Sequence, residues 1–146
     1  MFFRFRFLQL SLCIPLLLFV GCGDGSMGRV EGVVKFDGQP VDRALVTFYP
    51  ADARASVGFT DDDGRYYLNY TGKVKGAVVG EHQVTISTRI DKEDDNVASK
   101  YGGKGREEFL PPKYHSRRET ELTATVESGN NTIDFDLEPV PDLESE

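Results

Sequence analysis

Three consecutive aspartates stand directly before a glycine in the segment GFTDDDGRYYLNY, residues 58–70. Carboxylates this close together could hold a divalent cation, act as catalytic acids and bases, or cap the backbone of a turn. An EF-hand loop needs glycine at its sixth position and glutamate at its twelfth, but here glycine stands fourth and twelfth counted from the first aspartate. We therefore expect Asp61, Asp62 and Asp63 to form a β-hairpin turn closed by Gly64, with a weak surface cation site as the alternative.

The remaining polar residues show no spacing that would support catalysis or metal binding. The two histidines, His82 and His115, lie in different segments and have no Cys, His or carboxylate at metal-ligand spacing. We expect His82, at the start of a strand, to be a surface or edge residue, and His115 to lie on a loop surface. The glycine-rich segment YGGKGRE (101–107) precedes no helical pattern, so it does not match a nucleotide-binding loop. The sequence predicts a protein that is not an enzyme and has no metal or cofactor.

The first residues have the pattern of an export signal. Arg4 and Arg6 precede a mostly apolar run over residues 8–20, which is too short to span a bilayer core of about 30 Å. A short apolar run behind basic residues is typical of a secretory signal peptide. The run ends in LFVGC, which resembles the bacterial lipobox. This resemblance implies that Gly21 is the last residue removed and that Cys22 is lipidated and becomes the mature N-terminus. An ordinary signal peptide or an anchor helix is the alternative.

The cysteine count agrees with lipidation. Of the two cysteines, only Cys22 would remain after processing, so no disulfide could form within the mature chain. Cys13 is the rival acceptor, but the bulky Leu12 precedes it. Gly23 stands where an aspartate retains lipoproteins in the inner membrane of some bacteria. We therefore expect an exported bacterial lipoprotein of the cell envelope, anchored by acyl chains such as palmitate, in the outer membrane rather than the inner one.

The charge of the chain excludes some classes of partner. The chain has 17 basic and 24 acidic residues and a formal charge of −7. Residues 1–21 contain two arginines and no acid, so their removal leaves 15 basic residues against 24 acidic ones, a charge of −9. Nucleic-acid binding needs a basic face, and adhesion to anionic lipid also needs positive charge. We therefore expect no nucleic acid among the partners and contact with the membrane through the lipid anchor.

After Cys22 the apolar residues alternate with polar ones, which is the period of half-buried strands, and no segment shows a helical pattern. Turn signals at DGQP (37–40) and SGNN (128–131) favour antiparallel pairing. Seven short strands of this kind predict an all-β sandwich of two sheets. The predicted strands cover residues 29–36, 44–50, 56–60, 65–70, 82–88, 121–127 and 131–137. The side chains predicted to be buried include Val84, Ile86, Leu122, Val126, Ile133 and Phe135.

Residues 89–119 interrupt the strand pattern with a long, polar, glycine-containing segment. Loops of this length are usually functional or disordered. Phe109, Leu110 and Tyr114 are apolar enough to pack back on the sandwich. As an alternative, exposed rings of Tyr101, Phe109 and Tyr114 could stack on sugar rings, which would make the loop a ligand site.

Five segments together resemble a known family. They are VEGVVKFDGQPVDRALVTFYP, GFTDDDGRYYL, GAVVGEHQVTIS, LPPKY and LTATVESGNNTIDFDL. In this order they resemble the small bacterial lipoproteins built from one transthyretin-like (prealbumin-like) domain of the carboxypeptidase regulatory-like group. The resemblance implies a seven-strand Greek-key sandwich without catalytic residues. Two enzyme families share this type of fold, but the YRGS ending of the 5-hydroxyisourate hydrolases is absent, and no spacing supports the two tyrosines and two histidines of the intradiol dioxygenases.

The predicted organisation is a lipoprotein signal peptide (1–21), a short tether (22–28), a β-sandwich (29–137) with the long polar loop 89–119, and a disordered acidic tail (138–146). We expect a lipid-anchored, non-catalytic cell-envelope module with a structural or protein-interaction role. Its expected partners are the membrane and an unknown envelope protein or glycan. The alternative function is a carbohydrate- or peptide-binding module that uses the loop.

Overall fold

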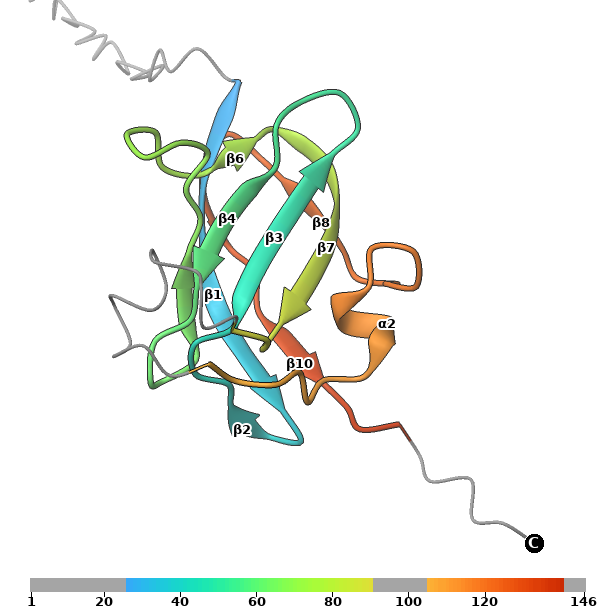
Figure 1. Cartoon of the computed structure of the whole chain (residues 1–146). Coiled ribbons are helices and arrows are strands. Elements are labelled where there is room, and N and C mark those ends of the chain that lie inside the picture. Colours follow the sequence, from blue (N-terminus) through green and yellow to red (C-terminus); the bar gives the residue numbers. More distant parts are fainter. Residues whose placement is uncertain (1–25, 91–104, 141–146) are drawn as a thin grey trace, which may run out of the picture.

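The computed structural model of this chain describes residues 26–90 and 105–140 (Figure 1). The regular elements are almost all strands. They are β1 (Met27–Phe36), β2 (Gln39–Pro40), β3 (Leu45–Pro50), β4 (Ser56–Phe59), β5 (Arg65–Tyr67), β6 (Ala77–Val78), β7 (Gly80–Ser87), β8 (Thr123–Val126), β9 (Gly129–Thr132) and β10 (Phe135–Leu137). A short helix, α2 (Pro112–His115), packs beside β7. Within these residues, no helix has the length and apolar character that crossing a membrane requires.

The strands form two sheets that lie face to face as a sandwich (Figure 1). In one sheet β1 is central: β2, β5 and β6 pair with it in the antiparallel direction, and β9 and β10 pair with it in the parallel direction. The other sheet is antiparallel and has the order β4-β3-β7-β8. Every segment predicted as a strand contains one, and the all-β sandwich expected from the sequence is confirmed.

The last predicted strand, residues 131–137, differs from the expectation in direction and continuity. It runs parallel to β1, whereas we expected antiparallel pairing. It is also divided into β9 and β10, because Asp134 Oδ1 accepts the N–H of Val33 at 2.8 Å where a backbone carbonyl would continue the ladder. The turn before it, with Gly129 at φ +96°, carries the chain from β8 in one sheet to β9 in the other.

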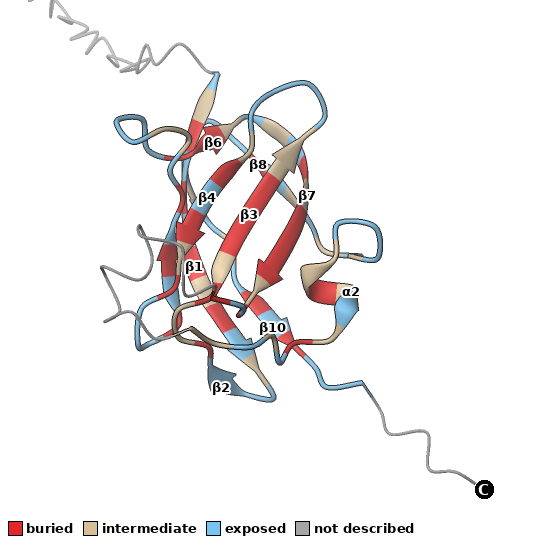
Figure 2. Cartoon of the chain, viewed as in Figure 1, coloured by how far each residue is buried: buried red, intermediate tan, exposed pale blue. Residues whose placement is uncertain are grey.

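The inward faces of the two sheets meet in one core, which Figure 2 shows as buried residues along β1, β3 and β7. Phe48 on β3, Tyr66 on β5 and Phe135 on β10 form its aromatic centre, with ring centroids 6.1 to 6.5 Å apart. Of the six side chains predicted to be buried, four are buried (Val84, Ile86, Val126 and Phe135) and two are partly buried against the same core (Leu122 and Ile133). The inward register of these strands is therefore confirmed.

The segment 105–119, at the end of the predicted loop, packs against the sandwich. Arg106 and Ile90 form a β-bridge that brings the returning chain beside the end of β7. Leu110 and Tyr114 are buried, as their apolar character predicted. The helix α2 was not predicted, since a four-residue helix that begins with proline has no amphipathic period of its own.

The ends of the described chain are held by the domain. β1 begins at Met27, so the predicted tether 22–28 overlaps the first strand. Glu138, which the sequence assigned to the tail, has both backbone groups bound to the hydroxyl of Tyr114: its N–H donates to the hydroxyl oxygen and its carbonyl accepts the hydroxyl proton, each at 3.0 Å. The segments 1–25, 91–104 and 141–146 lie outside the described residues.

Candidate functional site

The aspartate segment forms the turn that the sequence predicted. The N–H of Asp61 donates to the carbonyl of Arg65 at 2.9 Å, and the N–H of Gly64 donates to the carbonyl of Asp61 at 3.0 Å. Asp61 Oδ1 also accepts the N–H groups of Asp63 and Arg65, at 3.0 and 2.9 Å. One carboxylate oxygen thus satisfies two backbone donors, which is the ordinary role of aspartate in a turn. Asp62 and Asp63 project into solvent.

Gly64 closes the turn in the left-handed region at φ +75°, as expected. Its position is also crowded, because a Cβ there would lie 2.5 Å from the carbonyl oxygen of Val34 and 3.1 Å from Cβ of Pro40. The N–H of Val34 donates to the carbonyl of Gly64 at 2.8 Å, which fixes the turn against β1. Only glycine satisfies both the backbone angle and the close approach.

The strands on either side of this turn belong to different sheets, so the segment is not the simple hairpin that we predicted. β4 pairs with β3, whereas β5 pairs with β1. The chain just after β5 returns to β4 at a bridge between Val57 and Asn69. The turn therefore joins the two layers of the sandwich. Within the described residues, no three His, Cys, Asp or Glu side chains are placed to hold a metal ion.

Glu108 is the most extensively hydrogen-bonded carboxylate of the described chain. It accepts the hydroxyl of Ser87 at 2.6 Å, the hydroxyl and N–H of Thr88, and the N–H groups of Phe109 and Leu110, both at 3.1 Å. Burial alone would raise the pKa of Glu108, but the hydrogen bonds from Ser87, Thr88 and Leu110 outweigh it and hold the pKa below its usual range. The carboxylate fixes the returning segment to the end of β7.

Arg106 fixes the same segment to the loop between β2 and β3 as well as to the end of β7. Its guanidinium donates to the carbonyl of Thr88 at 2.7 Å, to the carbonyl of Asp42 at 2.8 Å and to Asp42 Oδ1 at 3.2 Å. The hydrogen bond from Arg43, assisted by the charge of Arg106, holds the pKa of Asp42 below its usual range against the opposing effect of burial. These groups are occupied by one another and by backbone, so they form a structural clamp.

The three rings proposed as a loop ligand site do not form a common surface in the described residues. Tyr114 is only 8% exposed, because its ring packs in the core and its hydroxyl binds Glu138. Phe109 is 50% exposed, with its ring edge against Phe36 at 6.1 Å and the Arg106 guanidinium 5.5 Å from its centroid. Tyr101 lies outside the described residues. The stacking role predicted for Tyr114 is therefore wrong.

The prediction for His82 is also wrong. This histidine is 2% exposed and points into the core, where its ring lies 5.6 Å from Phe48. Its Nε2 lies 2.7 Å from the carbonyl oxygen of Val78, which requires the proton on that nitrogen. The alternation of β7 places His82 on the same face as Val84 and Ile86. His115, at the end of α2, is half-buried.

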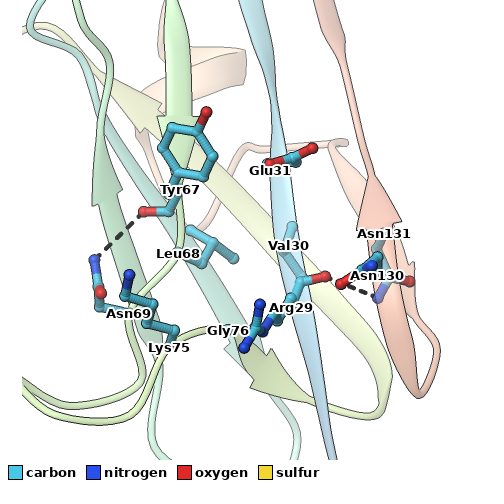
Figure 3. Close-up of a pocket in the computed structure, with 10 residues that line it drawn as sticks. All are labelled: Arg29, Val30, Glu31, Tyr67, Leu68, Asn69, Lys75, Gly76, Asn130 and Asn131. Atoms are coloured by element: carbon cyan, nitrogen blue, oxygen red, sulfur yellow. Dashed lines mark hydrogen bonds between the residues drawn. The ribbon is translucent and has the colours of Figure 1, made fainter.

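A hollow of about 570 Å³ lies on the outer face of the β1 sheet (Figure 3). Its rim carries polar side chains from β1, β5, β9 and the loop after β5. They are Arg29, Glu31, Tyr67, Asn69, Lys75 and Asn130. Tyr67, at 59% exposure, is the most exposed large apolar or aromatic side chain of the described residues.

Sequence reasoning missed this hollow, although part of its signal was present. Alternation predicted that Val30 points inward on the first strand, so Arg29 and Glu31 had to point outward. The tyrosine pair after the turn likewise places Tyr66 in the core and Tyr67 outside. The pattern could not predict that the loop carrying Lys75 approaches β1, because this approach depends on long-range packing.

The predicted lipidation site cannot be placed by geometry. Gly21 and Cys22 both lie outside the described residues.

Comparisons with known proteins do not assign the chain to a family. No family model matches it, and no curated protein matches it. Among solved structures, a DUF3823 family protein from Parabacteroides merdae is similar over 80% of this chain, with 14% sequence identity and a TM-score of 0.43. The chain spans about half of that structure, 48% of its length. A likeness this distant carries no inference about function.

Proposed function

We propose that this chain is a lipid-anchored, non-catalytic module of the bacterial cell envelope with a structural or protein-interaction role. The observation that carries the proposal is the Gly21–Cys22 pair at the end of a basic and then apolar segment. β1 begins at Met27, only a few residues after Cys22. Acyl chains on Cys22 would therefore hold the sandwich directly at the membrane surface.

The hydrogen bonding of the described polar groups supports a role without catalysis. A general base needs a free lone pair that can reach a substrate proton. Glu108 instead accepts hydrogen bonds from Ser87, Thr88 and the backbone of the returning segment. Asp42 is bound by Arg43 and Arg106. The carboxylates that the fold gathers are used to hold the chain together.

We further propose that the domain is of the transthyretin-like, carboxypeptidase regulatory-like type, with the order of the five sequence segments as support. Two glycines of those segments have a clear physical role. A Cβ at Gly32 would collide with the carbonyl of Ile133, and Gly64 closes the turn between the sheets. Both glycines therefore belong to the architecture of the sandwich.

The test is acylation and fractionation of the full chain in a bacterial host. Metabolic labelling with a palmitate analogue should label the wild type, and the label should follow the membrane fraction. Cys22→Ser should abolish the label, whereas the matched variant Cys13→Ser should keep it. Sucrose-gradient separation then distinguishes the outer membrane, which we expect, from the inner one. Labelling that survives Cys22→Ser, or robust turnover in a substrate screen of the purified chain, would contradict the proposal.

A further inference from the structure

The outer face of the β1 sheet presents an aromatic ring between hydrogen-bonding side chains. Glu31 on β1 and Tyr67 on β5 are direct partners in the antiparallel register. Side chains of such partners lie about 4.5 to 5.5 Å apart at Cβ. On the other flank of β1, Asn130 is the register partner of Arg29. The strands thus fix these four side chains on one surface (Figure 3).

The hollow between these side chains is formed by rigid backbone. Gly76 has φ +101°, and a Cβ there would collide with the carbonyl of Gly28, so the chain passes directly against β1 at this point. The N–H of Gly76 donates to the carbonyl of Leu68 at 2.8 Å. This contact places Lys75 on the rim opposite β9. The side-chain amide of Asn131 donates to the carbonyls of Arg29 and Glu127, at 3.0 and 2.8 Å, and locks the other wall.

Two positive charges face this hollow in a chain whose formal charge is −7. Arg29 and Lys75 both line it, and within residues 26–90 and 105–140 neither side chain has an ion-pair partner. Val30 and Leu68, which also line the hollow, are buried. A ligand must therefore match an aromatic face, amide and carboxylate groups, and two cations.

We propose that this hollow binds an acidic carbohydrate chain, with one sugar ring against Tyr67 and a uronate carboxylate between Arg29 and Lys75. A sugar has an apolar ring face that packs on tyrosine and hydroxyls that both donate and accept, which suits Glu31 and Asn130. A carboxylate gains charge-assisted hydrogen bonds from arginine and lysine. The inference deepens the proposed function, because it names a glycan as the envelope partner of the anchored module.

Binding of a peptide fits the same surface less well. An extended peptide usually adds to a free strand edge or inserts side chains into pockets. At this hollow, β1 is paired on both sides, with β5 and β6 on one flank and β9 on the other. The backbone groups of β1 are therefore already used.

The experiment is isothermal titration of the full chain, purified in detergent, with trigalacturonate, its methyl ester and neutral cellotriose. We expect binding of the acid form and a loss of at least about tenfold in affinity for the ester, since esterification removes the charge and leaves the sugar rings unchanged. Tyr67→Ala should weaken binding about tenfold, whereas Tyr67→Phe should retain it within about threefold. Arg29→Gln and Lys75→Gln should each weaken it about three- to tenfold.

Phe109→Ala is the matched control, because among the described residues it removes the other exposed aromatic ring, and it tests the loop as a rival site. It should leave the affinity unchanged. The inference is overturned if the wild type binds no uronate, if acid and ester bind equally, or if Phe109→Ala abolishes binding while Tyr67→Ala does not. Peptides bound through Tyr67 in place of uronate would also overturn it. A chain that is acylated at Cys22 yet binds no uronate would overturn the glycan site and leave the anchored module standing.

Discussion

The aspartate turn and the Glu108 clamp, by which we mean the contacts of Glu108 with Ser87, Thr88 and the returning segment, use carboxylates in opposite settings. Asp61, Asp62 and Asp63 attract attention in the sequence because they are consecutive, yet they lie in solvent and only Asp61 has a defined backbone role. Glu108 stands in a polar segment without any motif, yet it accepts hydrogen bonds from two hydroxyls and several N–H groups. Adjacency in the sequence is therefore a poor guide to what a carboxylate does.

The difference lies in the distance along the chain to the partners. Asp61 binds groups two and four residues away, whereas Glu108 binds Ser87 and Thr88, which are 21 and 20 residues away. A turn whose hydrogen-bond partners lie within a few residues can be predicted from the local sequence pattern. Distant partners meet only when the returning segment packs beside the end of β7. Loss of a distant partner should therefore affect the whole domain, and the following changes test this contrast.

Truncation of a core side chain should have the largest effect on the free energy of unfolding. Phe135→Ala should lower the free energy of unfolding by about 3 to 5 kcal/mol, because it removes buried apolar surface and leaves a cavity beside Phe48 and Tyr66. Chemical denaturation of the purified protein measures this. An unchanged midpoint would mean that β10 does not face the core.

Removal of the Glu108 clamp should have the second largest effect on the free energy of unfolding. Glu108→Ala should cost about 2 to 3 kcal/mol, because it leaves the hydroxyls of Ser87 and Thr88 and nearby N–H groups without their acceptor. The neighbouring Glu107 is exposed and supplies the matched control. Glu107→Ala should change the denaturation midpoint little. If Glu108→Ala and Glu107→Ala lowered the denaturation midpoint equally, Glu108 would contribute no more to stability than a solvated carboxylate, which would contradict the prediction.

The pH dependence of stability should depend on the same residue. The folded-state pKa of Glu108 is depressed, so its stabilisation is complete above the unfolded pKa of about 4.3 and is lost as the pH falls below that value toward the folded pKa. Melting temperatures across this acid range should therefore fall less steeply for Glu108→Gln than for the wild type. Glu107→Gln should keep the steep dependence. Parallel curves for the wild type and Glu108→Gln would contradict the role of the clamp.

Within the turn, the glycine should matter more than any carboxylate. Gly64→Ala should cost about 1 to 2 kcal/mol, because a Cβ is unfavourable at φ +75° and would press on the carbonyl of Val34. Gly38 is a suitable control, since it also has positive φ, +73°, but has nothing within 4 Å of an added Cβ. Gly38→Ala should therefore cost less. The reverse order in thermal melts would show that crowding at Gly64 is unimportant.

The strands were predictable because, in a half-buried strand, every second residue is apolar and faces inward. Val46 and Phe48, or Val84 and Ile86, define such faces without knowledge of the partner strand. Which strands pair, and in which direction, cannot be predicted from such a local pattern. The parallel approach of β9 and β10 to β1 depends on which layer each strand joins, and alternation is the same for either direction.

Two predictions for polar residues were wrong, and for different reasons. His82 was expected at the surface because it is polar and begins a strand, but its position in the alternation of β7 placed it in the core. Tyr114 was proposed for ligand stacking, but its hydroxyl is bound to Glu138 from the end of the chain. The burial of His82 follows from the same alternation as that of Val84 and Ile86, whereas Glu138 lies 24 residues from Tyr114 and cannot be inferred from neighbouring residues. The sequence left open whether Tyr66 or Tyr67 faces the core, and the structure shows that Tyr66 is buried and Tyr67 exposed. The hollow beside Tyr67 depends on long-range packing and could not be inferred.

The central claim is that the conspicuous aspartates shape the backbone and do not bind a cation. Its most direct test is the melting temperature of the wild type and of Asp62→Asn, each with millimolar calcium and with chelator. We expect the same melting temperature in all four samples, because Asp62 is exposed and asparagine tolerates the same turn. A calcium-dependent rise in the wild type that Asp62→Asn abolishes would contradict the claim, since only a cation site stabilises in this way.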